Sequence, residues 1–158
     1  MIERTLILVK PDGVQRSLIG EIISRFERKG LTLIGLKMMS LDDALLDSHY
    51  AHLSNKPFFN DIKDFMKSSP IVAIVWEGGR GTVSAVRIMV GPTKGQEAPS
   101  GTIRGDFGLS GSNNIVHASD SVENGQAEVG RFFREDELFD YEKTILTHIY
   151  SMEEREEK

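Results

Sequence analysis

Apolar residues recur along this chain with two different periods, and the alternation between them predicts a mixed fold of strands and helices. Short, nearly continuous apolar runs are typical of buried strands, whereas apolar residues three and four positions apart are typical of helices that bury one face. The runs predict four strands, at 5–9, 31–39, 71–76 and 115–117. The helical spacing predicts five helices: one between Ser17 and Gly30, three over 41–53, 58–66 and 82–90, and one from Asp120 to Phe133.

The residues that flank these segments predict where they begin and end. Pro11 stops the first strand, because proline cannot continue a strand ladder. Ser17 is the expected N-cap and Gly30 the expected C-cap of the first helix. Asp120, with Glu123 three positions later, is the expected cap of the last one. The stretch 91–113 is rich in glycine and proline and is expected to be a long ordered loop, which is often functional.

The resulting order is β-α-β-(α)-β-α-β-α, which predicts a ferredoxin-like βαββαβ sandwich of the α+β class. We expect an antiparallel sheet with helices on one face, plus extra helices and the loop at about 91–113. A parallel, flavodoxin-like sheet is the alternative, but it would need more strands of this length. We expect one domain over 1–150 and a charged tail over 151–158 that is frayed from Glu153 onward.

Composition narrows the class of function. The chain has 158 residues, of which 39% are hydrophobic and 27% charged, as in ordinary globular proteins. It has no cysteine, which excludes disulfides, thiol catalysis and thiolate metal sites, and we predict a cytoplasmic location. The longest apolar run, 71–76, is far too short to cross a membrane. The net charge of -5 argues against a dedicated nucleic-acid site and favours small phosphates, held in a local basic pocket.

His117 is the strongest candidate for chemistry, because it lies at a strand-to-helix corner. Imidazole is nucleophilic and partly neutral near pH 7, so it can attack phosphorus without a separate base. Glu128 lies about two turns into the following helix, where its carboxylate could bind the other ring nitrogen and orient it. Taken alone, each of these two residues also has an ordinary structural interpretation. Asp120 and Ser121 are expected to cap that helix, beside Ser119.

Three cations are expected to hold an anion near that histidine. Lys10 follows a buried strand, Arg87 lies among apolar residues, and Arg104 lies in a glycine-flanked loop. Guanidinium groups match the geometry of phosphate oxygens, and Thr93 would add a hydroxyl. If they converge on His117, the chain holds a nucleophile and an anion clamp together, which indicates phosphoryl transfer through a phosphohistidine.

Several other motifs carry little weight. Asp106-Phe107-Gly108 matches a protein-kinase motif, but the chain lacks the catalytic loop that accompanies it and is too short for that fold. There is no phosphate-binding P-loop and no dinucleotide-binding glycine motif. No cluster of histidines and carboxylates has metal-ligand spacing, so Mg²⁺ would arrive on the phosphates of a nucleotide.

The sequence closely resembles the nucleoside diphosphate kinases over almost its whole length, from Ile2 to about Tyr150. The segments that carry this resemblance are Glu3-Arg4-Thr5, Val9-Lys10-Pro11-Asp12-Gly13-Val14-Gln15-Arg16, Gly20-Glu21-Ile22-Ile23, Pro57-Phe58-Phe59, Val75-Trp76-Glu77-Gly78, Gly101-Thr102-Ile103-Arg104-Gly105-Asp106-Phe107 and Asn114-x-x-His117-Ala118-Ser119-Asp120. Together these motifs are highly specific.

The resemblance implies a ferredoxin-like fold and ping-pong transfer of the γ-phosphate, mainly of ATP, to a nucleoside diphosphate. It implies that His117 is the phosphorylated nucleophile and that Phe58 stacks on the base. By matching position, the residues that would hold phosphates or ribose are Lys10, Arg87, Thr93, Arg104 and Asn114, and those that would support the site are Tyr50, Ser119, Asp120 and Glu128.

The resemblance also implies a homo-oligomer, with a hexamer expected and a tetramer as the alternative. The family pattern is modified at Gly111, where many eukaryotic members carry an apolar residue against the base, so one-sided contact with the base is expected. Two other interpretations stay open at this point. One is an oligomeric binding module with vestigial catalysis, and the other is a histidine phosphocarrier that serves another protein.

Overall fold

The protein folds around a four-stranded antiparallel sheet. The structure, a computed structural model, describes residues 2–156. The strands are β1 (Glu3–Val9), β2 (Thr32–Met39), β3 (Ile71–Gly78) and β4 (Val116–Ala118), in the order β2-β3-β1-β4. Every neighbouring pair is antiparallel. This topology confirms the expected ferredoxin-like α+β fold.

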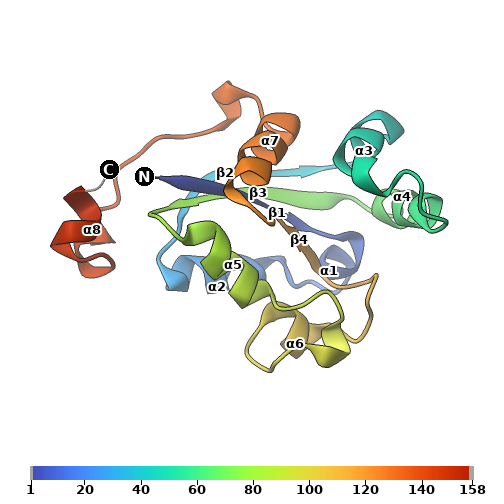
Figure 1. The fold of residues 1–158 in the computed structure, drawn as a ribbon, viewed down its shortest axis with the longest axis horizontal. Coiled ribbons are helices and arrows are strands. Elements are labelled where there is room, and N and C mark those ends of the chain that lie inside the picture. Colours follow the sequence, from blue (N-terminus) through green and yellow to red (C-terminus); the bar gives the residue numbers. More distant parts are fainter. Residues whose placement is uncertain (1, 157–158) are drawn as a thin grey trace.

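Helices cover both faces of the sheet, so the molecule has three layers (Figure 1). The two helices of the βαββαβ unit, α2 (Ile19–Lys29) and α5 (Thr82–Val90), lie on one face. Three additional helices lie on the other face: α3 (Asp43–His49), α4 (Phe59–Lys67) and α7 (Val122–Phe132). The expectation of helices on one face therefore holds only for the core unit.

The second helical layer follows from the composition of β1. A strand that faces water on one side alternates between apolar and polar residues, but residues 5–9 of β1 are all fully buried. Ile7 and Val9 pack into the core beneath α2 and α5. Leu6 and Leu8 pack into a second core beneath α3, α4 and α7. Because both faces of β1 are apolar, both must be covered.

Most element boundaries match the expectations within a few residues, and two caps were wrongly assigned. Gly30 ends α2 in the left-handed region with φ of 102°, as expected. Ser17 does not cap α2: its own φ is 57°, and Leu18 occupies the cap position. Ser121 caps α7 by accepting a hydrogen bond from the amide of Asn124, whereas Asp120 accepts one from the side chain of that asparagine.

Other segments hold more regular structure than expected. A short helix, α1 (Pro11–Gln15), follows β1 directly, where the sequence analysis expected only a stop. The loop at 91–113 contains a second short helix, α6 (Ile103–Phe107). The expected helix over 41–53 divides into α3 and a 3₁₀ turn, Ala51–Leu53. In the tail, α8 (Met152–Glu156) stands where fraying was expected, and residues 157–158 lie outside the described part.

None of the helices within residues 2–156 combines the length and apolar character needed to cross a membrane.

Candidate active site

A cavity of about 1070 Å³ opens beside β4, between the 91–114 segment and the layer formed by α3, α4 and α7. Of the eleven residues that the sequence analysis singled out for the site, ten line it: Lys10, Tyr50, Phe58, Arg87, Thr93, Arg104, Asn114, His117, Asp120 and Glu128. Ser119 is fully buried and lies behind Glu128. Segments that are distant in sequence therefore meet at one place.

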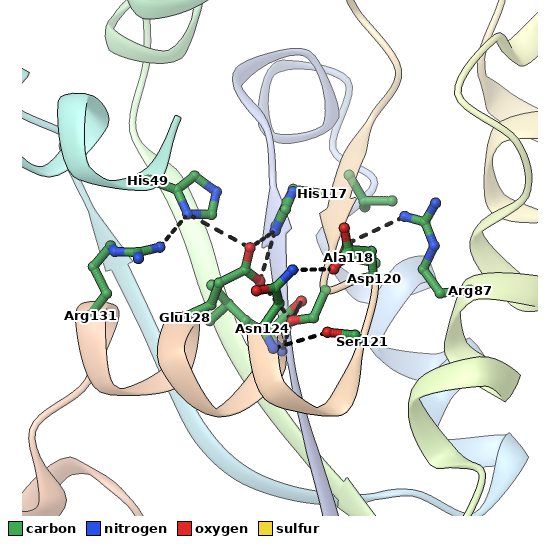
Figure 2. Close-up of polar contacts among 12 residues, drawn as sticks. His49, Arg87, His117, Ala118, Asp120, Ser121, Asn124, Glu128 and Arg131 are labelled. Atoms are coloured by element: carbon green, nitrogen blue, oxygen red, sulfur yellow. Dashed lines mark hydrogen bonds and ion pairs between the residues drawn. The ribbon is translucent and has the colours of Figure 1, made fainter. Parts of the chain in front are cut away.

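His117 is held by a carboxylate on the next helix (Figure 2). Its Nε2 lies 3.0 Å from both carboxylate oxygens of Glu128, and Ser119 Oγ donates to the same carboxylate at 2.7 Å. Burial by itself would raise the pKa of Glu128, but the hydrogen bonds from His117 and Ser119 bring that pKa below its ordinary value. Glu128 is therefore an anion that accepts from both neighbours.

This contact determines which ring nitrogen of His117 is available for chemistry. A carboxylate only accepts hydrogen bonds, so the Nε2 that faces Glu128 carries the hydrogen. In the neutral ring the lone pair is then on Nδ1, which makes no hydrogen bond to any described residue. His117 is thus a fixed imidazole with a free nucleophilic nitrogen, on the wall of the cavity.

Lys10 stands at the end of β1 and donates from Nζ to Asn114 Oδ1 at 2.8 Å. Burial and the nearby Arg104 lower its pKa from 10.5 to about 8. The amide nitrogen of Asn114 donates in turn to the backbone oxygens of Thr93 and Gly111. Asn114 therefore connects the ammonium of Lys10 to the loop on the other side of the cavity.

The guanidinium of Arg104 is almost completely buried, with 4% of the residue exposed. It donates one hydrogen bond to each of three backbone oxygens, those of Gly91, Asn114 and Val116. Burial, with Arg87 close by, lowers its pKa to about 10, so it is charged at pH 7. A guanidinium has five N–H groups, so two remain for an anion. Arg87 makes one bond, to the oxygen of Ala118 at 3.3 Å, and adds a second positive group (Figure 2).

The backbone around Ile115 ties the end of β1 to the start of β4. Ile115 has φ of 73°, in a region that β-branched residues rarely occupy. Its amide donates to Asp12 Oδ2, and its oxygen accepts from the amide of Lys10. These two bonds keep Ile115 in the unfavourable conformation and place Lys10 opposite Ile115, two residues before His117.

The opposite end of the cavity is more open. Phe58 precedes α4 and is 46% exposed. Thr93 and Gly111, whose backbone oxygens accept from Asn114, line the cavity beside that residue, and Gly111 offers no side chain. Phe58 therefore offers an exposed aromatic face to a planar group.

Two further residues near His117 were not predicted from the sequence. His49, at the end of α3, packs edge-on against the His117 ring with centroids 4.6 Å apart. Arg131, on α7, donates to His49 Nδ1 at 3.3 Å. Neither had a sequence signal, because a histidine and an arginine on amphipathic helices are usually structural or solvated.

Among residues 2–156, one group has donors close enough together for a metal ion: His49, His117 and Glu128, whose ligand atoms lie within 4.8 Å. Mg²⁺ prefers oxygen ligands, whereas two members of this group are imidazoles. Both oxygens of Glu128 already accept hydrogen bonds. The group therefore does not fit Mg²⁺.

Comparison with known proteins places this architecture in a family. The family model described as nucleoside diphosphate kinase matches residues 3–138. A protein named nucleoside diphosphate kinase from Parabacteroides distasonis is 51% identical over 152 residues, which cover 96% of this chain and 99% of that protein. One from Bacillus anthracis is 49% identical over 148 residues, 94% of this chain and 99% of that protein.

Solved structures agree with this match. A halophilic nucleoside diphosphate kinase from Halobacterium salinarum, in complex with CDP, superposes with a TM-score of 0.92 at 42% identity. The match covers 96% of this chain and all of that one. A nucleoside diphosphate kinase family protein from Babesia bovis gives a TM-score of 0.90 at 44% identity, over 94% of this chain and 99% of that one.

Proposed function

Because this chain belongs to the nucleoside diphosphate kinase family, we propose that His117 carries the phosphate between its two nucleotide substrates. The chain is a phosphotransferase that acts on nucleoside phosphates and moves the terminal phosphate of a triphosphate to a diphosphate. The observation that carries the proposal is the fixed ring of His117, which has a free Nδ1 and lies on the wall of a cavity that also contains three cations.

The transfer takes place in two half-reactions. In the first, the lone pair on Nδ1 of His117 attacks the γ-phosphorus of a nucleoside triphosphate such as ATP. The bond from that phosphorus to the bridging oxygen breaks, and its electron pair leaves with the diphosphate. In the second, a terminal oxygen of an acceptor diphosphate attacks the same phosphorus, and the electron pair of the P–N bond returns to Nδ1. The Nε2 hydrogen stays on the ring throughout, directed at Glu128.

Lys10, Arg87 and Arg104 stabilise the charge that spreads over the transferring group. Phosphoryl transfer needs little covalent help from the protein, so positioned cations supply most of the catalysis. Asn114 holds Lys10 in place, and its Oδ1 has a second lone pair for a ribose hydroxyl. Thr93, whose backbone oxygen accepts from Asn114, adds a hydroxyl for the phosphates or ribose, and Asp120 and Tyr50 support the walls of the cavity.

The family needs a divalent cation, and we propose that it is Mg²⁺ bound to the nucleotide phosphates as part of the substrate. When bound, it would neutralise part of the phosphate charge. The positively charged side chains of Lys10, Arg87 and Arg104 would bind phosphate oxygens. The Mg²⁺ ion would take its oxygen ligands from the nucleotide and from water.

We also propose a homo-oligomer, a hexamer in preference to a tetramer. Exposed apolar side chains support it: Leu36 and Met38 on the edge strand β2 are 49% and 58% exposed, and Leu109 in the loop is 87% exposed. Light scattering of the purified protein would give the number of subunits.

A cytoplasmic location and a single catalytic domain over residues 1–150 stay predictions.

Incubation with γ-labelled ATP and Mg²⁺ tests the proposed function. We expect an acid-labile, base-stable label on His117 that passes to added GDP or CDP. Retention of the label in the presence of diphosphates would favour a binding module with vestigial catalysis. Transfer to another protein, but not to free diphosphates, would favour a phosphocarrier.

A further inference from the structure

His49 is a buried histidine that the mechanism above does not use. It ends α3, and 1% of its side chain is exposed. Its ring packs edge-on against the rings of Tyr50, His117 and Phe132, with centroid distances of 4.6, 4.6 and 5.1 Å. Such packing on three sides fixes the position of the ring but leaves open which nitrogen carries the hydrogen.

The charge and surroundings of His49 determine which of its ring nitrogens carries the hydrogen. Burial, helped by the neighbouring His117, lowers its pKa to about 3, so the ring is neutral at pH 7. Its Nδ1 lies 3.3 Å from Arg131 Nη1. A guanidinium only donates hydrogen bonds, so Nδ1 must accept and the hydrogen must be on Nε2. That Nε2 has no hydrogen-bond partner among the described residues, so the ring adopts this tautomer although it leaves a buried donor unsatisfied.

The alternative tautomer would compete with the catalytic histidine. His49 Nδ1 lies 3.9 Å from Glu128 Oε1, the oxygen that also accepts from His117 Nε2 at 3.0 Å. With a hydrogen on Nδ1, a small movement would let His49 donate to Glu128 and draw the carboxylate away from His117. With a lone pair on Nδ1, His49 cannot donate to the carboxylate.

We propose that Arg131 is a positioning residue that holds His49 in the tautomer with Nε2–H and so reserves Glu128 for His117. Glu128 and Arg131 are three positions apart on α7 and therefore lie on the same face of the helix, where both approach Nδ1 of His49 (Figure 2). The inference rests on the proposed role of His117. It adds that the orientation of the nucleophile depends on a residue that does not contact it.

The direct test reads the tautomer itself. In protein labelled with ¹⁵N-histidine, nitrogen chemical shifts distinguish a ring nitrogen that carries hydrogen from one that does not, and the His49→Phe variant assigns the His49 signals. We expect Nδ1 of His49 to be the bare nitrogen in the wild type and to gain hydrogen in Arg131→Leu. Arg28→Leu, on the exposed surface of α2 across the sheet, is the matched control and should leave the signals unchanged. An unchanged His49 tautomer in Arg131→Leu would overturn the proposal.

A double-mutant cycle tests the consequence for chemistry. In single-turnover reactions with γ-labelled ATP, Arg131→Leu should slow phosphorylation of His117 by about threefold to tenfold, the effect of one weakened hydrogen bond. In a His49→Phe background the same substitution should have no effect, because phenylalanine keeps the packing but cannot donate to Glu128. Equal slowing in both backgrounds would mean that Arg131 acts directly, and would also overturn the proposal. Failure of the proposed function would appear differently, as the absence of any label on His117 in the wild type.

Discussion

The two ends of the cavity are built in opposite ways. At the end where we propose that the phosphates bind, here called the phosphate end, Arg104 is almost fully buried and bonds to three backbone oxygens, and His117 is fixed by Glu128. At the base end, where we propose that Phe58 stacks on the base, that residue is about half exposed. Groups that act on the transferred phosphate must be in place before the reaction, because reorganising them would add to the barrier. Groups that contact the base need only offer a flat surface, so we expect this site to accept nucleotides with different bases.

Substitution of His117 should give the largest effect. In His117→Ala we expect turnover to fall by more than about a thousandfold, since the nucleophile is lost. Nucleotide binding should change little, because Lys10 and the two arginines remain. Measurement of phosphoenzyme and of nucleotide affinity on the same preparation checks both parts, and retained turnover would refute the role of His117.

Removal of Arg104 should have the next largest effect. Arg104→Ala is expected to lower kcat by a factor on the order of 10²–10³, the cost of losing one preorganised group at the developing charge. His148→Ala is a suitable control, since His148 is exposed in a 3₁₀ turn near the end of the chain. Because Arg104 also holds three backbone oxygens, a thermal unfolding curve must accompany the kinetics. Equal kcat in the two variants would contradict the proposed role of Arg104 in stabilising the transferring phosphate.

The pH dependence of Lys10 sharpens the comparison within the phosphate end. Its pKa is lowered to about 8, so it loses its positive charge as the pH rises through that value. We therefore expect kcat/KM to fall by about tenfold between pH 7 and pH 9, since this ratio reports the ionisation of the free enzyme. In Lys10→Arg the side chain stays charged and this fall should disappear, whatever the absolute rate. A wild-type profile that is flat over this range would show that the Lys10 charge does not matter.

The same shift in pKa has a consequence for stability. The folded state holds the Lys10 proton less tightly than the unfolded state, whose lysine keeps its ordinary pKa of 10.5. Between about pH 8 and 10.5 the unfolded chain therefore binds more protons, and this group alone makes stability rise with pH there. As the pH rises through the pKa of Lys10, phosphate binding is therefore expected to weaken while the contribution of this group to stability increases.

Phe58→Ala tests the base end and should have the smallest effect. Stacking on an aromatic ring contributes about 1–3 kcal/mol, and half exposure places Phe58 at the lower limit, or about fivefold in Kd. The loss should be similar for ADP, GDP, CDP and UDP, because every base has a flat face. A loss confined to one base would indicate specific contacts at this end.

The two ends also differ in how far the sequence could predict them. His117, Arg87 and Lys10 could be predicted because they stand at strand ends or among apolar neighbours, where a charged or polar side chain is uncommon without a partner or a function. His49 and Arg131 were missed because their meeting depends on how α3 packs against α7, which spacing along one helix does not contain. Similarly, α5 was predicted to the residue because its apolar period is clear. The α1 helix was missed because five residues are too few to show a period.

The caps show why local rules fail at such corners. Ser17 and Asp120 are both good cap residues by type, but neighbours took the cap position. Ser17 instead adopts a φ of 57° between α1 and α2, and Ser121, the other cap expected for α7, takes the bond from the Asn124 amide.

Strand β1 has a mechanical consequence for the site. Lys10 follows its last residue. Within the strand, the amide of Leu6 donates to Ser119 Oγ and its oxygen accepts from the Ser119 amide, and Ser119 Oγ in turn donates to Glu128. One central strand, paired with neighbours along both edges, therefore sets the separation between Lys10 and the serine that supports Glu128. Phe58 belongs to a different part of the fold, just before α4, so a movement of α4 would change the contact with the base and leave the spacing along β1 unchanged.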